Sequence, residues 1–247
     1  MGQIIAVVSG KGGTGKTSFT AAVGSALALQ KKRTLCLDCD VGLRNLDISL
    51  GLTDRTLMDF SDVIHQRCSL NEAIVRHPRI PHLYLLTAPV YLRSQDIPLS
   101  GMQQLMQEIS QRFDYCLLDA PAGLDSGFQL ATTAAQRCIV VSTPDNTSLR
   151  DAQRAVLELN RFPRGCVHLA INRLQKKVLR QLHQTIDDAM DAAGLPLIGV
   201  IPEDPAIPLA ANRSTPLLLT DNHYSAQAYR NIAGRIAGER IPLMKIR

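Results

Sequence analysis

The first chemically informative segment is a glycine-rich loop with two lysines near the N-terminus. Residues 10–17 read Gly-Lys-Gly-Gly-Thr-Gly-Lys-Thr, which fits the pattern G-x-x-x-x-G-K-[ST]. Glycines let backbone N–H groups wrap a polyphosphate, and the free N–H groups of a following helix attract the same anion. Lys16 can neutralise phosphate oxygens, and the hydroxyl of Thr17 can coordinate Mg²⁺ directly. The loop therefore predicts an ATP site made by Gly10, Lys11, Gly12, Gly13, Thr14, Gly15, Lys16, Thr17 and Ser18.

Carboxylates at the ends of two apolar stretches can complete such a site. Asp119 ends the stretch 113–119, which is the usual arrangement for an acid in the water shell of the metal. Asp38 and Asp40 follow the apolar residues 34–37. If that strand continued to Asp40, both side chains would point the same way, because side chains alternate along a strand. One acid could then hold a metal-bound water and the other could orient the attacking water.

The elements that position these residues alternate between short β-rich runs and longer helical patterns. The runs are continuously apolar, as in a parallel sheet covered on both faces, and such alternation implies βαβ crossovers in one open sheet. The predicted strands are 3–8, 34–38, 83–87, 115–119, 138–142, 167–172 and 197–201. The predicted helices are 16–30, 100–111, 147–160, 176–193 and 224–236. The sequence thus predicts a single α/β domain over residues 1–240, with a doubly wound, mostly parallel sheet of seven to eight strands, and a short tail over 241–247.

Composition narrows the class of protein. The 247 residues are 45% hydrophobic, and 27 Lys and Arg against 22 Asp and Glu leave a small net charge. A disordered chain would have fewer hydrophobic residues and a higher net charge, so this composition excludes one. No apolar run approaches the ~20 residues that span a bilayer, and no cationic segment precedes the first apolar run, so a cytoplasmic protein with six reduced, mostly buried cysteines is expected. Five Tyr, five Phe and no Trp offer no aromatic ladder for stacking bases, which argues against nucleic acid as a partner.

Besides Lys16, the loop contains another lysine, Lys11, which makes the chain similar to a known family. Lys11 stands at the first lysine of K-G-G-x-G-K-T, the deviant Walker A motif, so the chain resembles the MinD/ParA family of ATPases. The similarity extends over residues 1–240. Four segments make the sequence more similar to the MinD branch than to the rest of the family: 38–47, 119–123, 148–151 and 199–204. The most specific parts are Gly-Leu-Arg-Asn-Leu-Asp at 42–47 and Ile-Pro-Glu-Asp at 201–204.

The resemblance implies roles for individual residues. Family members bind ATP and Mg²⁺ and dimerise face to face, with the lysine equivalent to Lys11 reaching the partner's phosphates. By this resemblance Lys11, Lys16 and Asp40 are the catalytic residues, and Asp40 positions the hydrolytic water. Asp38 and Asp119 resemble the switch acids that meet Mg²⁺ through water. The positions that match the residues holding the adenine are Asn172, Pro202, Glu203 and Asp204.

The resemblance also implies a biological role. MinD-like proteins are slow ATPases that switch by ATP-dependent homodimerisation and regulate placement of the division septum. Their partners are a MinC-type septum inhibitor and a MinE-type or other topological factor, which triggers hydrolysis. Two alternatives within the family are a ParA-type partition ATPase that binds DNA non-specifically and a flagellar-number regulator, which normally carries an N-terminal extension. An iron–sulfur carrier would need a C-x-x-C pair near the C-terminus, and none follows Cys166.

The C-terminal tail departs from the family pattern. MinD-like chains usually end in a cationic amphipathic helix that enters the membrane, but only five residues follow Pro242 here, little more than one helical turn. The tail is nevertheless apolar and basic, with Ile241, Leu243, Met244, Lys245, Ile246 and Arg247. Two interpretations stay open: a solvated or core-packed tail, and a weak anchor to the inner face of the cell membrane that two tails of a dimer would strengthen.

Overall fold

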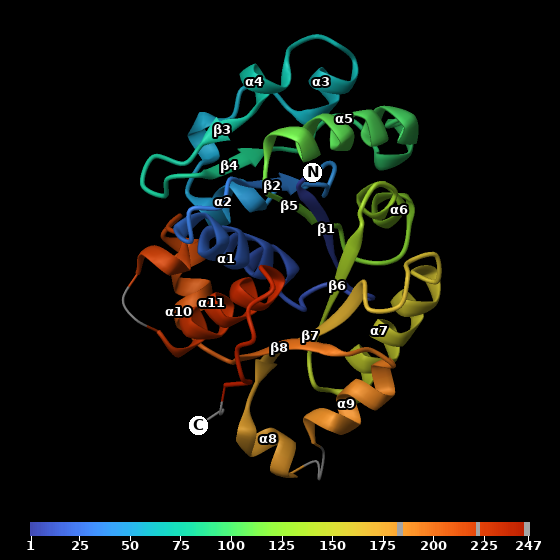
Figure 1. Cartoon of the computed structure of the whole chain (residues 1–247), viewed down its shortest axis with the longest axis vertical. Coiled ribbons are helices and arrows are strands. Elements are labelled where there is room, and N and C mark those ends of the chain that lie inside the picture. Colours follow the sequence, from blue (N-terminus) through green and yellow to red (C-terminus); the bar gives the residue numbers. More distant parts are fainter. Residues whose placement is uncertain (182–184, 221–222, 245–247) are drawn as a thin grey trace.

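A single, mostly parallel sheet forms the centre of the molecule in the computed structural model, which describes residues 1–181, 185–220 and 223–244 (Figure 1). Within those ranges eight strands lie in the order β3-β4-β2-β5-β1-β6-β7-β8, and all neighbours are parallel except β3 and β4. The strands are β1 Gln3–Val8, β2 Thr34–Asp38, β3 Val75–Arg76, β4 Leu83–Leu86, β5 Tyr115–Asp119, β6 Arg137–Ser142, β7 Val167–Leu174 and β8 Leu197–Pro202. The predicted fold class is confirmed.

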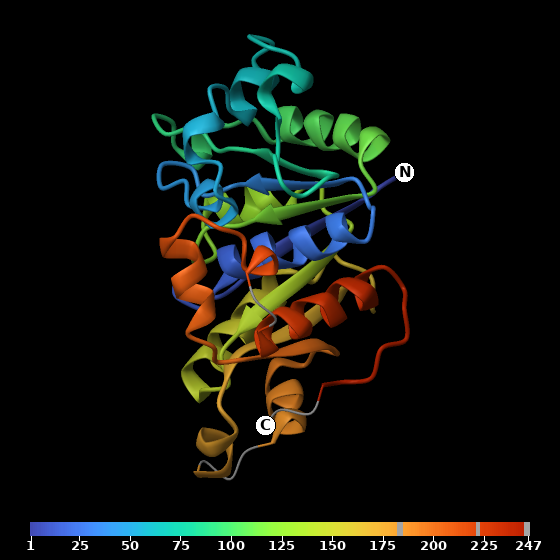
Figure 2. The ribbon, with the colours of Figure 1, turned by 90° about the vertical axis from the view of Figure 1, so that its left-hand side faces the viewer.

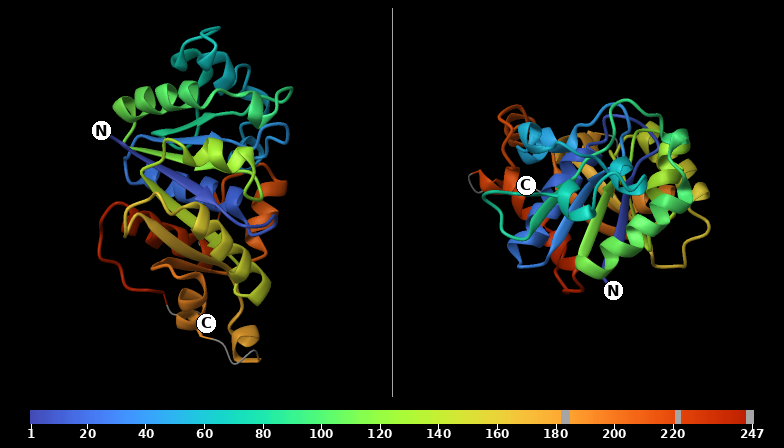
Figure 3. Two further views of the ribbon diagram at one scale, coloured as in Figure 1. Left: turned by 90° about the vertical axis from the view of Figure 1, so that its right-hand side faces the viewer. Right: turned by 90° about the horizontal axis from the view of Figure 1, so that it is seen from above.

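Helices cover both faces of the sheet, as the two side views show (Figures 2 and 3). Helices α1, α2, α10 and α11 lie on one face, and α5, α6, α7 and α9 on the other. Their bounds are α1 Lys16–Leu29, α2 Leu46–Leu50, α3 Phe60–Ile64, α4 Leu70–Ala73, α5 Leu99–Arg112, α6 Ser126–Thr132, α7 Asn146–Glu158, α8 Lys176–Gln181, α9 Ile186–Ala193, α10 Ala206–Asn212 and α11 Tyr224–Ile236. Short 3₁₀ turns cover Thr53–Arg55, Ser94–Asp96 and Leu217–Leu219.

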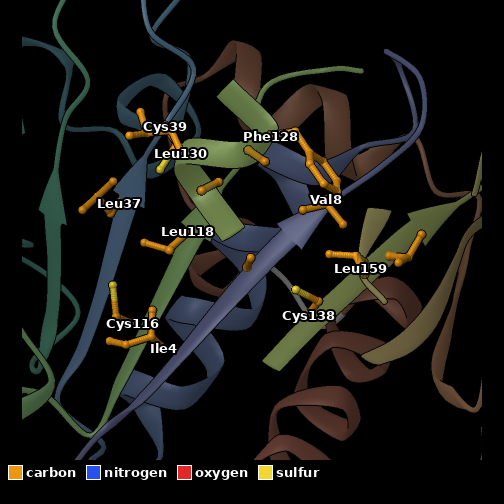
Figure 4. Close-up of a cluster of buried hydrophobic side chains, with 14 of the residues drawn as sticks. Ile4, Val8, Leu37, Cys39, Cys116, Leu118, Phe128, Leu130, Cys138 and Leu159 are labelled. Atoms are coloured by element: carbon orange, nitrogen blue, oxygen red, sulfur yellow. The ribbon is translucent and has the colours of Figure 1, made fainter. Parts of the chain in front are cut away.

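The core explains why the strands read as continuous apolar runs. Side chains of β1 and β5 alternate between two buried layers, so that Ile4 and Val8 face one set of helices and Ile5 and Val7 the other. Figure 4 shows the first layer, in which Leu118 and Phe128 meet side chains from β1 and β2. Burial on both faces removes the polar alternation of a one-sided sheet. The rigid sheet therefore fixes the carboxyl ends of β1, β2 and β5 relative to one another.

The single helix predicted for residues 176–193 is wrong. Helix α8 is described as far as Gln181, residues 182–184 lie outside the described ranges, and a second helix, α9, begins at Ile186 after the non-helical Thr185. Thr185 caps α9: its hydroxyl accepts from the N–H of Asp188, and its own N–H donates to the Asp188 carboxylate. This reciprocal arrangement is a capping box, which stabilises a new helix start. Other predicted ends differ by one or two residues. The sequence analysis did not predict the two-residue edge strand β3 or the short helices α2, α3, α4, α6 and α10.

The C-terminal tail begins packed against the body of the protein. Arg235 donates from Nε to the Ile241 carbonyl at 2.9 Å, from Nη2 to the Pro242 carbonyl at 2.8 Å, and from Nη1 to the Ile198 carbonyl of β8 at 2.7 Å. Met244 packs against the core, while Leu243 is 52% exposed. Residues 245–247 lie outside the described ranges, so the predicted anchor is only partly visible. Among the described residues, no helix has the length and apolar content needed to cross a bilayer.

Candidate functional site

The phosphate-binding loop connects β1 to α1 and depends on two glycines with left-handed backbones. Gly13 has φ of 78° and Gly15 has φ of 91°, a region that other residues rarely adopt. A Cβ on Gly15 would lie 2.3 Å from Nδ2 of Asn172, whereas a Cβ on Gly13 would meet no atom within 4 Å. Gly15 is the N-cap of α1, and the first helical turn carries no acidic residue. The free N–H groups and positive end of α1 are therefore available to an anion.

The two loop lysines lie in different surroundings. Lys16 is buried, and its Nζ donates to the hydroxyl of Ser9 at 2.7 Å. Burial lowers the pKa of Lys16, although Asp119 and Asp40 act in the opposite direction. Lys11 is partly exposed and pairs with Asp145 at 3.3 Å, where the side chains are 34% and 51% exposed. Lys16 is thus placed inside the loop, while Lys11 lies at its outer surface.

Two buried carboxylates face each other across neighbouring strands. Asp38 and Asp119 are direct partners in the register of β2 and β5, and both are at most 1% exposed. Burial and the nearby charge of Asp38 together raise the pKa of Asp119 to about 7, against the hydrogen bonds from Thr17 and Thr20 and the charge of Lys16. Such a pair gains from a cation, because a bound positive charge offsets the cost of two buried negative charges.

Asp38 also shapes the loop that follows β2. Its carboxylate accepts hydrogen bonds from the N–H groups of Asp40 at 2.8 Å, Asn45 at 3.0 Å and Leu46 at 3.0 Å. These three bonds lower the pKa of Asp38, but burial outweighs them and raises it to about 6. The backbone of the loop is therefore organised around one side chain.

The predicted strand end at Asp38 is confirmed, so the condition under which Asp38 and Asp40 would point the same way is not met. Strand β2 ends at Asp38, and the chain turns so that the N–H of Asp40 bonds back to the Asp38 carboxylate. Asp40 remains partly exposed at the carboxyl end of the sheet. Burial raises the pKa of Asp40 and Lys16 lowers it, so the carboxylate of Asp40 and the amine of Lys16 interact. The turn, rather than strand alternation, brings Asp40 to the loop.

The residues expected around the base lie at the ends of β7 and β8. Asn172 lies within β7, and its Nδ2 donates to the Thr14 carbonyl at 2.8 Å, so it braces the phosphate loop. Pro202 ends β8. Asp204 accepts from the N–H of Ala206 at 2.9 Å and from the hydroxyl of Ser225 at 2.7 Å. The amide of Asn172 and the carboxylate of Asp204 thus already have partners within the chain, and Glu203 lines the cavity beside the loop.

Three residues of this site were not singled out from the sequence. Ser9 accepts from Lys16 and donates to the Lys11 carbonyl at 2.6 Å, and Thr20 donates to Asp119 at 3.2 Å. Thr20 could have been found, because it stands one helical turn after Lys16 and faces the same way. Asp145 caps α7 through the N–H of Ser148 at 2.9 Å besides pairing with Lys11. Its cap role has a local signature, but its approach to Lys11 depends on the tertiary fold.

The site fits a magnesium nucleotide on grounds of its own geometry. The hydroxyl of Thr14 is buried in the loop and has no hydrogen-bond partner among the described residues, although buried polar atoms are normally paired. A cavity of about 510 Å³ opens beside the loop. Nowhere in the described ranges do three or more His, Cys, Asp or Glu side chains gather as a metal cage. Mg²⁺ suits such a site, since it takes one or two protein ligands and keeps its waters and phosphate oxygens.

Comparisons with known proteins agree on the family. A family model described as an AAA domain matches residues 2–165. The septum site-determining protein MinD of Synechocystis is 38% identical over 247 residues, which cover 99% of this chain and 92% of the relative. The structure of the MinC:MinD complex of Aquifex aeolicus superposes with a TM-score of 0.90 at 35% identity, covering 98% of each chain. MinD of Pyrococcus horikoshii, solved with Mg-ADP, gives a TM-score of 0.83 at 28% identity and covers 96% of each chain.

Sequence and structure thus lead to one assignment. The deviant loop with Lys11 and Lys16, the eight-stranded sheet, and full-length similarity to MinD proteins from several organisms describe the same kind of molecule. The chain belongs to the MinD family, the septum site-determining branch of the deviant Walker A ATPases.

Proposed function

We propose that this protein is a slow, Mg²⁺-dependent ATPase that dimerises with ATP and regulates septum placement through a MinC-type inhibitor. The observation that carries the proposal is the different placement of the two lysines. Lys16 is buried within its own loop, whereas Lys11 is partly exposed and held by one exposed ion pair. An exposed pair contributes little, about 0–1 kcal/mol, so Lys11 can leave Asp145 for a stronger anion.

The proposed roles follow the geometry. Lys16 and the N–H groups at the start of α1 hold the β- and γ-phosphates, and the Thr17 hydroxyl coordinates Mg²⁺. Asp38 and Asp119 accept hydrogen bonds from the water shell of the metal, while Asp40 orients the attacking water. Lys11 reaches the phosphates of the partner subunit. Asn172, Pro202, Glu203 and Asp204 border the space for the base, where Asn172 acts through the loop that it braces.

Partners and location complete the proposal. The likeness to the MinC:MinD complex of Aquifex aeolicus supports a MinC-type partner. We expect a MinE-type or other topological factor to stimulate hydrolysis. Residues 1–240 form the ATPase domain, and the tail from 241 contacts the membrane weakly from the cytoplasmic side. The exposed Leu243 supports this contact, whereas the three bonds of Arg235 hold the start of the tail to the domain.

Paired lysine substitutions test the proposal. Lys16→Ala should abolish ATP binding, because the loop loses its buried positive charge. Lys11→Ala should retain ATP binding but lose ATP-dependent dimerisation and hydrolysis. Lys32→Ala, an exposed lysine beyond α1, is the matched control and should change neither. Calorimetry measures binding and light scattering measures the mass. Dimers of Lys11→Ala that hydrolyse ATP at the normal rate would refute the role across the interface.

A further inference from the structure

Helix α2 is short, and side chains from elsewhere in the chain hold both of its ends. Its five residues are too few to form a stable helix alone. At the N-terminal end, the Asp38 carboxylate accepts the N–H groups of Asn45 and Leu46, both at 3.0 Å. At the other end, Nε2 of His77 lies 3.1 Å from the Leu50 carbonyl oxygen. A helix leaves carbonyl oxygens unpaired at its C-terminal end, so this contact satisfies one of them.

His77 forms hydrogen bonds through both ring nitrogens. It follows β3 and is only 4% exposed, and its Nδ1 accepts the N–H groups of Arg79 at 3.1 Å and Ile80 at 2.9 Å. In a neutral ring whose Nδ1 accepts, the proton is on Nε2, which then donates to the Leu50 carbonyl. Burial lowers the pKa of His77, and the charges of Arg79 and Arg55 act in the same direction, against the hydrogen bond to α2. One nitrogen therefore holds a local turn, and the other holds α2.

This contact bears on the site because α2 and Asp40 share one carboxylate. Oδ2 of Asp38 accepts from the start of α2, while Oδ1 accepts the N–H of Asp40 at 2.8 Å. Leu50 and Ile80 lie in one buried cluster, so the end of α2 also packs against the turn that His77 holds. If α2 moved, Asp38 would lose two of its three N–H partners, and the loop that carries Asp40 would lose its second fixed end.

We propose that His77 is a positioning residue that clamps the C-terminal end of α2 and thereby fixes the loop that carries Asp40. This inference rests on the proposed function, since it takes Asp40 to orient the attacking water. His77 is not among the residues that line the cavity beside the phosphate loop, so it acts through α2 rather than on the nucleotide. Its loss should therefore slow hydrolysis and leave nucleotide affinity unchanged.

Two substitutions of His77 separate the clamp from the turn. His77→Asn keeps an acceptor near the position of Nδ1, because asparagine bonds to N–H groups two and three residues ahead, but its side chain is too short to reach the Leu50 carbonyl. His77→Gln extends an amide donor toward that carbonyl and lacks the acceptor of the turn. His77→Asn should slow hydrolysis about 2- to 10-fold, as expected for one lost hydrogen bond, with the affinity for Mg²⁺-ADP unchanged. His77→Gln should restore most of the rate.

A control and two further readouts distinguish positioning from a general loss of stability. His82→Asn, in the same connection between β3 and β4, should keep the wild-type rate, because asparagine tolerates the left-handed φ of 70° there. Hydrogen exchange of residues 46–51, measured without nucleotide, should be about 2- to 10-fold faster in His77→Asn than in His77→Gln, since the clamp opens locally. In the Asp40→Ala background, His77→Asn should slow hydrolysis no further, because both changes act on the same step.

The possible outcomes separate this inference from the function on which it rests. Wild-type protein that does not hydrolyse ATP would refute the proposed function, and equal exchange in the two His77 variants would refute the clamp independently. Normal hydrolysis by both wild type and His77→Asn would refute only the positioning role. Equal losses for His77→Asn and His77→Gln would assign His77 to the turn alone and overturn the inference. Further slowing of Asp40→Ala by His77→Asn would mean that the effect bypasses Asp40, which would also overturn it.

Discussion

The close approach of Gly15 to Asn172 supports a quantitative prediction about the phosphate loop. Gly15→Ala places a Cβ on a backbone with φ of 91°, 2.3 Å from Nδ2 of Asn172. The left-handed backbone alone costs about 1–2 kcal/mol. The methyl group also displaces the Asn172 amide from the Thr14 carbonyl, and a lost buried hydrogen bond costs about 1–2 kcal/mol. The free energy of unfolding should therefore fall by about 2–4 kcal/mol.

Thermal unfolding of the nucleotide-free protein measures this loss. In a chain of this size each kcal/mol lowers the melting temperature by about 2–4 °C, so a drop of roughly 5–15 °C is expected. Gly13→Ala is the matched control, because Gly13 has a similar φ of 78° but a Cβ there meets no atom within 4 Å. That variant should lose only the backbone contribution of about 1–2 kcal/mol. Equal losses for Gly13→Ala and Gly15→Ala would refute the steric part of the reasoning.

A double-mutant cycle isolates the contact itself. Asn172→Ala removes the amide that a Cβ on Gly15 would strike. Adding Gly15→Ala to that background should cost only the strain of the left-handed backbone. The two substitutions should therefore be non-additive by about 1–2 kcal/mol, as is typical of residues in contact. Additive losses would mean that Asn172 does not support the loop.

Three further predictions concern the acids and the tail. Asp40→Ala should bind ATP and accumulate as a dimer. It should hydrolyse ATP on the order of 10²-fold more slowly in a phosphate-release assay, because the attacking water loses its orientation. Normal turnover would show that another group positions the water. Asp119 has a pKa of about 7 in the folded protein against 3.8 in the unfolded chain, so the folded state binds this proton more tightly. Protonated Asp119 therefore adds to the free energy of unfolding at low pH, and this contribution is lost as the pH rises from about 4 through about 7. Asp119→Asn cannot ionise, so without ligand it should have a higher melting temperature than wild type at about pH 8. It should nevertheless bind Mg²⁺-ATP more weakly. A lower melting temperature than wild type at about pH 8 would contradict the assignment of a buried charge to Asp119. Deletion of residues 241–247 should abolish ATP-dependent cosedimentation with anionic vesicles and spare ATPase activity in solution, whereas equal sedimentation would move the membrane contact elsewhere.

The sequence predicted the features whose signals are local. Strand β1, the glycine loop and the start of α1 at Lys16 are consecutive in the chain, so one motif sets both their order and their chemistry. Asp38 and Asp119 each end an apolar run, and parallel pairing brings strand ends together at one edge. The strands β1, β2 and β5 and helix α11 match their predicted ranges for the same reason.

Features that depend on tertiary contacts could not be predicted in this way. The turn at Asp40 forms because the Asp38 carboxylate accepts three N–H groups of the following loop, and no residue spacing reveals that choice. The register shift between β7 and β8 around Arg173 sits inside an otherwise ordinary strand and was not expected. The break before α9 is a different case, because the capping box of Thr185 and Asp188 is a local signal that the prediction of one helix overlooked.

The central claim is that ATP converts this protein from a monomer into a dimer through Lys11. Size-exclusion chromatography with light scattering, run in Mg²⁺-ADP and in Mg²⁺-ATP, tests it most directly. Asp40→Ala should be included, because slow hydrolysis keeps the ATP state populated during the run. We predict the mass of one chain in ADP and twice that mass in ATP, with Lys11→Ala monomeric in both. The same mass in ADP and ATP for wild type and Asp40→Ala, with ATP binding intact, would contradict the claim.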